Sequence, residues 1–150
     1  MRRAFNMMMA IFMLLLLSGL AVLTMQYTRI HATHFVDSYN KEQAELFMDS
    51  VIEATLLKIE GRDRQADGCL RSLLFTSADN RFEANVTIEK YYMFQGKDNN
   101  GSEPPAGCPV QSIASPMSHG YVEFTVVVRS TDHAKVATPI RITRKTLQRP

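Results

Sequence analysis

The sequence lacks the short motifs that mark the common classes of enzyme. It has no glycine-rich phosphate loop, no nucleophile elbow and no HExxH sequence. We therefore expect the protein not to be an enzyme and to need no cofactor. Tryptophan is also absent, and the formal net charge is only +2, so the overall charge gives no sign of nucleic-acid binding.

Charge is missing altogether from residues 4–28, which follow Arg2 and Arg3 directly. An apolar run of roughly 20 residues is long enough to cross a bilayer as a helix. Helix is also the form expected in lipid, because every backbone polar group must be satisfied within the segment. The positively charged end should stay in the cytoplasm, which places the rest of the chain on the other side of the membrane.

The order of residues at this terminus is informative. Arg2 and Arg3 are followed by the small residue Ala4, then by Phe5 and an unbroken apolar segment. This arrangement resembles the class III leader of type IV pilins and type II secretion pseudopilins. The resemblance implies that a prepilin peptidase cuts between Ala4 and Phe5 and then methylates Phe5. It also implies an inner-membrane protein with a periplasmic C-terminal part, which is extracellular if the subunit enters a pilus, and with other pilin or pseudopilin subunits as partners.

The chain departs from this family at three places, the first being Ala4, where the family usually has Gly but tolerates Ala. Asn6 and Met7 follow Phe5, where the family usually has Thr-Leu or a similar pair, and Met9 stands at the fifth mature position, where the family usually has Glu. In the family, that carboxylate is thought to pair with the N-terminal amine of a neighbouring subunit. Its absence therefore indicates a minor or tip-type subunit. The resemblance does not tell a pilus from a secretion system.

Two other interpretations of the segment stay open. It is either an uncut signal anchor, as in a single-pass periplasmic binding or scaffold protein, or a cleaved secretory signal. Residues 19–21 (Gly-Leu-Ala) form a possible cleavage site for a secretory signal. Apolar residues continue beyond that site through Val22, Leu23 and Met25, which fits a signal peptide poorly.

Residues 26–60 contain neither proline nor glycine, so we expect the helix to continue out of the membrane as far as Glu60, with Gly61 as its terminator. Residues 62–64 should continue as a polar loop. An apolar stripe at helical spacing predicts that this part packs on a sheet. The stripe consists of Val36, Tyr39, Phe47, Val51, Ala54 and Leu57, widened by Met48, Ile52 and Leu56. The expected organisation is a leader (1–4), a transmembrane helix half (5–28), an amphipathic helix half (29–60) and a sheet domain (61–150).

Alternating apolar residues predict strands at 82–94 and 121–129, and a third strand at 135–146. Lys90 interrupts the first alternation and indicates a bulge. Pro139 cannot donate to a sheet ladder, so the third strand should lie at an edge. The predicted inner face of the first strand consists of Phe82, Ala84, Val86, Ile88, Tyr92 and Phe94. In the second strand, Val122, Phe124, Val126 and Val128 should face the helix.

The fold class expected from these elements is α+β. A long N-terminal helix would pack on a small antiparallel sheet of about three strands, as in pilins. Residues 69–76 form a short apolar run of unassigned structure, and residues 95–120 are expected to be a long irregular connection.

Cys69 and Cys108 both lie in the part expected outside the membrane, where disulfides persist. A bridge between them would close a loop of about 40 residues, worth about 4 kcal/mol in the chain-entropy model. Two buried free thiols are the alternative. Neither cysteine lies in a CxxC or Cys/His cluster, so we expect no metal site there.

The remaining candidates are weaker. His31 and His34 are three residues apart on the expected helix but lack a specific third ligand, so no metal site is expected. The C-terminal part is rich in cations, which either protect an edge strand from pairing or contact DNA, as some minor pilins do during DNA uptake. These cations are Lys135, Arg141, Arg144, Lys145 and Arg149.

Overall fold

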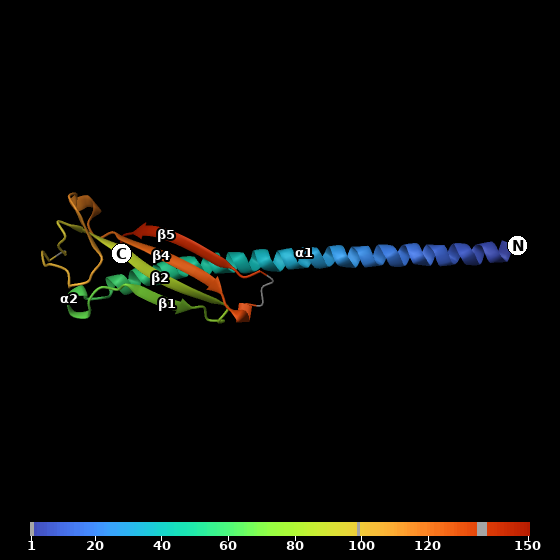
Figure 1. Cartoon of the computed structure of the whole chain (residues 1–150), viewed down its shortest axis with the longest axis horizontal. Coiled ribbons are helices and arrows are strands. Elements are labelled where there is room, and N and C mark those ends of the chain that lie inside the picture. Colours follow the sequence, from blue (N-terminus) through green and yellow to red (C-terminus); the bar gives the residue numbers. More distant parts are fainter. Residues whose placement is uncertain (1, 99, 135–137) are drawn as a thin grey trace. The chain divides into compact units, whose positions relative to one another are not determined.

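The structure, a computed structural model, describes residues 2–98, 100–134 and 138–150, with the side chains of 2–6, 30 and 133 outside the description (Figure 1). Its contacts divide the chain into two compact units, one ending at Tyr39 and the other running from Asn40 to Pro150. The predicted domain boundaries after residues 28 and 60 mark instead where the helix is expected to leave the membrane and where the sheet domain is expected to begin. These two boundaries remain predictions.

The described residues of the first unit, from Arg2 to Tyr39, are all helical. Helix α1 begins at Arg2 and ends at Glu60, so it belongs to both units. From Met7 onward it contains a stretch long and apolar enough to cross a membrane, with none of that stretch buried. The hydroxyls of Ser18 and Thr24 donate to backbone carbonyls three residues earlier. These bonds satisfy the polar groups locally and make them compatible with an apolar environment.

The second unit combines the C-terminal part of α1 with a five-stranded sheet, which confirms the α+β class (Figure 1). The strands lie in the order β1-β2-β4-β5, and all these neighbours are antiparallel. Strand β3 pairs with β2 in parallel. The strands are β1 (Ser72–Thr76), β2 (Phe82–Phe94), β3 (Val110–Ile113), β4 (Val122–Ser130) and β5 (Arg141–Gln148). Single turns of helix lie at α2 (Arg64–Asp67), Pro116–Ser118 and Asp132–Ala134.

The predicted number of about three strands was wrong because two short strands escaped detection. Strand β1 lies in the run 69–76, and β3 lies inside the connection predicted to be irregular. Both pair with the 13-residue β2, at residues 83–87 and 91–94 respectively. Four or five residues carry too little alternation to be recognised alone, and it is the length of β2 that lets both strands find a partner.

The bulge in β2 is confirmed, but its effect on the inner face was not anticipated. The register shifts between Ile88 and Lys90, and the buried residues after the shift are Tyr91 and Met93. A bulge adds one residue to one strand and so reverses which side chains face the core. The assignment of Tyr92 and Phe94 to the inner face was therefore wrong.

The predicted apolar stripe of α1 was also partly wrong. Leu57 is 68% exposed, and Val51 is the stripe's most deeply buried member apart from Met48. The buried positions of the helix are Asn40, Ala44, Met48, Val51, Thr55 and Ile59. Two of these are polar, and both are satisfied inside the fold. The Thr55 hydroxyl donates to the Val51 carbonyl at 2.7 Å. Because its hydrogen bond is made within the helix, Thr55 can be buried. The predicted stripe was misplaced because it assumed that all polar residues of the helix face solvent.

Strand β5 begins later than predicted, at Arg141, and Pro139 precedes it. Lys135 and Val136, the predicted start of this strand, lie outside the described residues. The edge position of β5 is confirmed by the strand order. Phe124, with Val122, Val126 and Val128 of β4, is buried as predicted, and the core lies between this face and α1.

Candidate functional site

The predicted leader site lies at the start of α1. Ala4 and Phe5 belong to the helix, but their side chains are outside the described residues. Met9 is 52% exposed, and the first turn of α1 contains no acidic residue. The apolar side chains around Met9 and after it are exposed as well, so this part of the helix presents a large apolar surface. They include Met7, Met8, Ile11, Phe12, Met13, Leu14, Leu15, Leu16, Leu17, Leu20, Val22 and Leu23.

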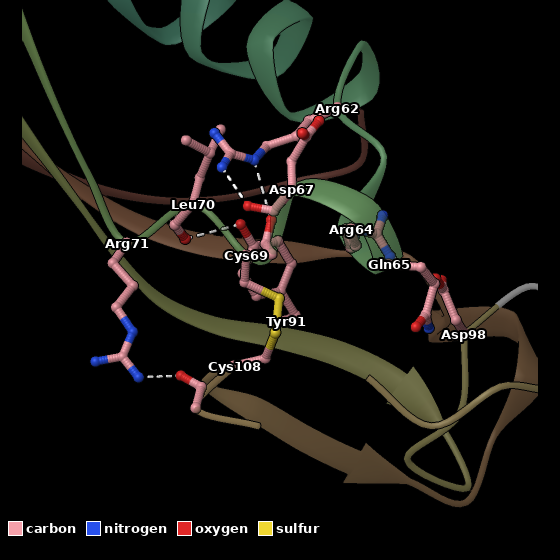
Figure 2. Close-up of a disulfide and its surroundings, with 12 residues drawn as sticks. Arg62, Arg64, Gln65, Asp67, Cys69, Leu70, Arg71, Tyr91, Asp98 and Cys108 are labelled. Atoms are coloured by element: carbon pink, nitrogen blue, oxygen red, sulfur yellow. Dashed lines mark hydrogen bonds and ion pairs between the residues drawn. A yellow bond between two sulfur atoms is a disulfide. The ribbon is translucent and has the colours of Figure 1, made fainter. Parts of the chain in front are cut away.

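The predicted disulfide between Cys69 and Cys108 is confirmed, with 5.4 Å between the two Cα atoms (Figure 2). The bond joins the residues just before β1 to the residues just before β3. Since both strands pair with β2, the bridge links two segments that the sheet already holds near each other. It thereby pins one end of the connection between β2 and β3.

Residues 97, 98 and 100–108, called here the stapled loop, are also held by an ion pair and hydrogen bonds from the segment that follows α1. Arg64 forms an ion pair with Asp98 at 2.8 Å, and the Gln65 side-chain amide donates to the Glu103 carbonyl at 3.0 Å. The Arg71 guanidinium donates to the carbonyl of Gly107, beside the disulfide (Figure 2). The loop is therefore attached at its start, middle and end.

The short helix α2 presents these side chains to the loop. Asp63 caps it, since its carboxylate accepts hydrogen bonds from the backbone N–H groups of Gln65, at 2.9 Å, and Ala66. The Arg62 guanidinium donates to the carbonyls of Asp67 and Gly68, which close the far end of the same turn. The prediction that residues 62–64 simply continue a polar loop was wrong at Arg64, where α2 begins.

Tyr91 lies beneath this arrangement and is buried. Its hydroxyl donates to the Leu70 carbonyl at 2.9 Å, and the Arg64 guanidinium lies 5.6 Å from the centre of its ring (Figure 2). Burial raises the pKa of Tyr91, so the phenol stays neutral and keeps donating its hydrogen bond. Sequence analysis missed this residue because the bulge reversed the inner face.

The stapled loop also contains its own turn. The backbone N–H of Gly101 donates to the Asp98 carbonyl at 2.8 Å, and the Asp98 N–H donates to the Ser102 carbonyl at 2.9 Å. Gly101 has φ +76°, a conformation that glycine adopts without strain. A loop held in this way presents a defined surface, which suits it for recognition.

The C-terminal cations are only partly available. Arg144 pairs with Asp49 of α1, and Lys145 bridges Glu89 at 2.6 Å and Glu123 at 3.0 Å. Lys135 lies outside the described residues. Neutralisation by neighbouring carboxylates weakens the case for a DNA-binding strip along β5.

Within residues 2–98, 100–134 and 138–150, no group of three His, Cys, Asp or Glu side chains could hold a metal ion. His31 contacts the Tyr27 ring, with 4.4 Å between the ring centres. No family model, curated protein or solved structure matches this chain. The candidate functional surfaces are therefore the exposed apolar part of α1 and the stapled loop.

Proposed function

We propose that this protein is a pilin-like minor subunit of a type IV pilus or a type II secretion pseudopilus. The observation that carries the proposal is the nature of α1. One 59-residue helix is apolar and exposed in its first part, and its last part supplies buried residues to the core of a sheet domain. A helix that both anchors in lipid and builds a small α+β domain is what the leader resemblance leads one to expect.

Its mechanism would be assembly. The apolar part of the helix is stored in the inner membrane and then extracted into a filament, where it packs against the helices of other subunits. Moving from lipid to a bundle of helices changes the apolar environment little, so side-chain packing and contacts between helices drive the step. The exposed methionines near the start of α1 suit such packing, because their flexible side chains adapt to irregular neighbours.

Under this proposal, the residue at the fifth mature position, Met9, indicates where in the filament the subunit lies. With no carboxylate at the fifth mature position, the chain cannot pair with the N-terminal amine of a neighbour in the usual way. Placement at the tip or in the complex that initiates assembly removes the need for that pair. The stapled loop would then face a neighbouring subunit or a ligand, and because it is already ordered it loses little conformational entropy on binding.

An uncut, single-pass anchored scaffold or binding protein of the periplasm is the second candidate. The same exposed apolar helix supports it. The two candidates differ in the state of the N-terminus, since only the pilin-like subunit is cut at Ala4–Phe5 and methylated.

Mass spectrometry of the N-terminus, on protein isolated from cells that contain a prepilin peptidase, tests the proposal. A chain that begins with methylated Phe5 is expected. An intact Met1 would instead identify the anchored protein, and a start near Val22 would identify a secreted one. Either result would overturn the pilin-like assignment.

A pair of variants sharpens this test. Ala4→Leu places a bulky residue at the cut and should cause the precursor to accumulate. Ala10→Leu makes the same change within the apolar segment, away from the cut, and should be processed normally. Equal processing of both variants would contradict cleavage at Ala4–Phe5.

A further inference from the structure

A pocket of about 400 Å³ opens beside the stapled loop, at the end of the sheet where β2 ends. The side chains that matter to its chemistry are Phe94, Lys97, Asp98, Pro116, His119 and Arg149. All belong to the second unit, and they come from three separate stretches of the chain. The volume lies within the range of sites that bind small molecules or single side chains.

Backbone hydrogen bonds hold the walls of this pocket in place. Two successive bonds close the turn after β2, from the Gly96 N–H to the Met93 carbonyl and from the Lys97 N–H to the Phe94 carbonyl, both at 3.1 Å. The next turn is closed by the Gly101 bond described above. The pocket therefore exists before any ligand binds, which lowers the entropic cost of binding.

His119 is fixed in one tautomer on the opposite wall. Its Nδ1 accepts a hydrogen bond from the backbone N–H of Phe94 at 2.8 Å. In the neutral ring the proton is therefore on Nε2. Gly120, which follows His119, has φ +87°. A Cβ atom added to Gly120 would lie 3.9 Å from the Nε atom of Arg149. The Arg149 side chain is therefore close to the backbone next to His119.

The charge of the pocket is positive. Asp98 is the one carboxylate among the described residues that line it, and Asp98 already pairs with Arg64. Lys97 and Arg149 form no ion pair with any carboxylate in the described part of the chain. Lys97 and Arg149, without a carboxylate partner among the described residues, line the same space, whereas Phe94 and Pro116 supply apolar walls.

We propose that this pocket binds an oxyanion group, a carboxylate or a phosphate, carried by a ligand with a small apolar body. The Arg149 guanidinium offers a planar fork of N–H donors that matches the two oxygens of such a group, and Lys97 adds a second charge. The ring of Phe94 contacts the apolar body. The site is independent of cleavage at Ala4–Phe5, so it would also serve an anchored periplasmic protein.

Benzoate and inorganic phosphate are suitable probes, titrated into the full chain in uncharged detergent micelles at constant ionic strength. Chemical shifts of the Gly101 and Gly120 amides report on the two sides of the pocket. We expect saturable shifts with at least one probe. Arg149→Gln and Lys97→Gln should each weaken binding about tenfold, the effect of losing one charge-assisted hydrogen bond of about 1.4 kcal/mol.

Arg141→Gln is the matched control, because it removes an exposed cation from the other end of β5 without touching the pocket. It should leave the affinity unchanged. Saturation by benzoate alone identifies a carboxylate site with an apolar body, and saturation by phosphate alone identifies a phosphate site. Shifts that rise linearly without saturating for both probes, or an equal loss of affinity in Arg141→Gln, would overturn the proposal. Two variants on different walls protect the test against misfolding of either one.

Discussion

The side-chain oxygen of Asn40, on α1, accepts a hydrogen bond from the guanidinium of Arg81, which directly precedes β2. Asn40 is only 1% exposed, and it is the first residue of the second unit. Arg81 also lies over the Phe82 ring, with 5.8 Å between its guanidinium carbon and the ring centre. The pair therefore joins the helix to the sheet where the folded domain begins.

Removing Arg81 should destabilise this domain. Arg81→Ala leaves the buried Asn40 oxygen without its donor, which costs about 1–3 kcal/mol. Thermal unfolding of the full chain in detergent, followed by near-UV circular dichroism of the tyrosines, measures the change. Arg129→Ala is the control, since Arg129 is exposed on β4. A similar loss of stability in both variants would show that the Asn40 contact contributes nothing specific.

The rotated stripe of α1 gives a second prediction. Met48→Ala opens a cavity at a fully buried position and should cost about 2–5 kcal/mol. Leu57→Ala, at a 68% exposed position, should change stability by less than about 0.5 kcal/mol. Urea denaturation of the two variants compares them directly. A larger loss of stability in Leu57→Ala than in Met48→Ala would show that Leu57 is buried and would contradict the buried stripe described here.

The disulfide should contribute substantially to stability. Replacing both Cys69 and Cys108 by serine removes a cross-link between residues 39 apart, which costs about 4 kcal/mol in the chain-entropy model. The urea midpoint of the wild type should fall when the protein is reduced with dithiothreitol. The serine variant should not respond to dithiothreitol, and any response there would assign the effect to something other than this bridge.

The cluster around Lys145 should make stability depend on pH. The pKa of the Glu89 carboxyl is lowered, first by the hydrogen bond from Lys145 and then by the one from Thr125. The pKa of Lys145 is raised above its usual value, first by Glu89 and then by Glu123. Lysine stays charged at every acidic and neutral pH, so the carboxylates decide where the interaction is lost.

A carboxyl group with a lowered pKa stabilises the fold above its unfolded pKa and loses that contribution as pH falls through the folded value. Lys145→Met should therefore lower the urea midpoint at about pH 7 and have a smaller effect at about pH 3. Lys41→Met, an exposed lysine on α1 that does not act on Glu89 or Lys145, serves as the control and should show no such difference. An equal loss at both pH values would contradict the role assigned to the glutamates.

Local patterns in the sequence predicted a large part of this fold. The stretch without proline or glycine predicted a helix that ends at Glu60, and alternation predicted β2 with its correct bounds and the buried face of β4. The cysteine pair was also correctly assigned. Each of these features depends on residues close together in the chain, or on a simple pairing rule.

Other features depended on partners that are distant in sequence. Strands β1 and β3 are too short to be recognised without β2, and the buried face of β2 after its bulge follows from pairing with β4. The buried stripe of α1 includes the polar residue Asn40 because Arg81, 41 residues later, donates a hydrogen bond to its side-chain oxygen.

The sequence by itself therefore indicated the long helix α1, the strands β2, β4 and β5, the apolar segment long enough to cross a membrane and the two cysteines able to pair. Only the tertiary structure decided which faces are buried, and it alone brought Lys97, His119 and Arg149 around one pocket. The physical reason is that periodicity records the average polarity of a face, whereas the burial of a polar group depends on whether the fold provides its hydrogen-bond partner.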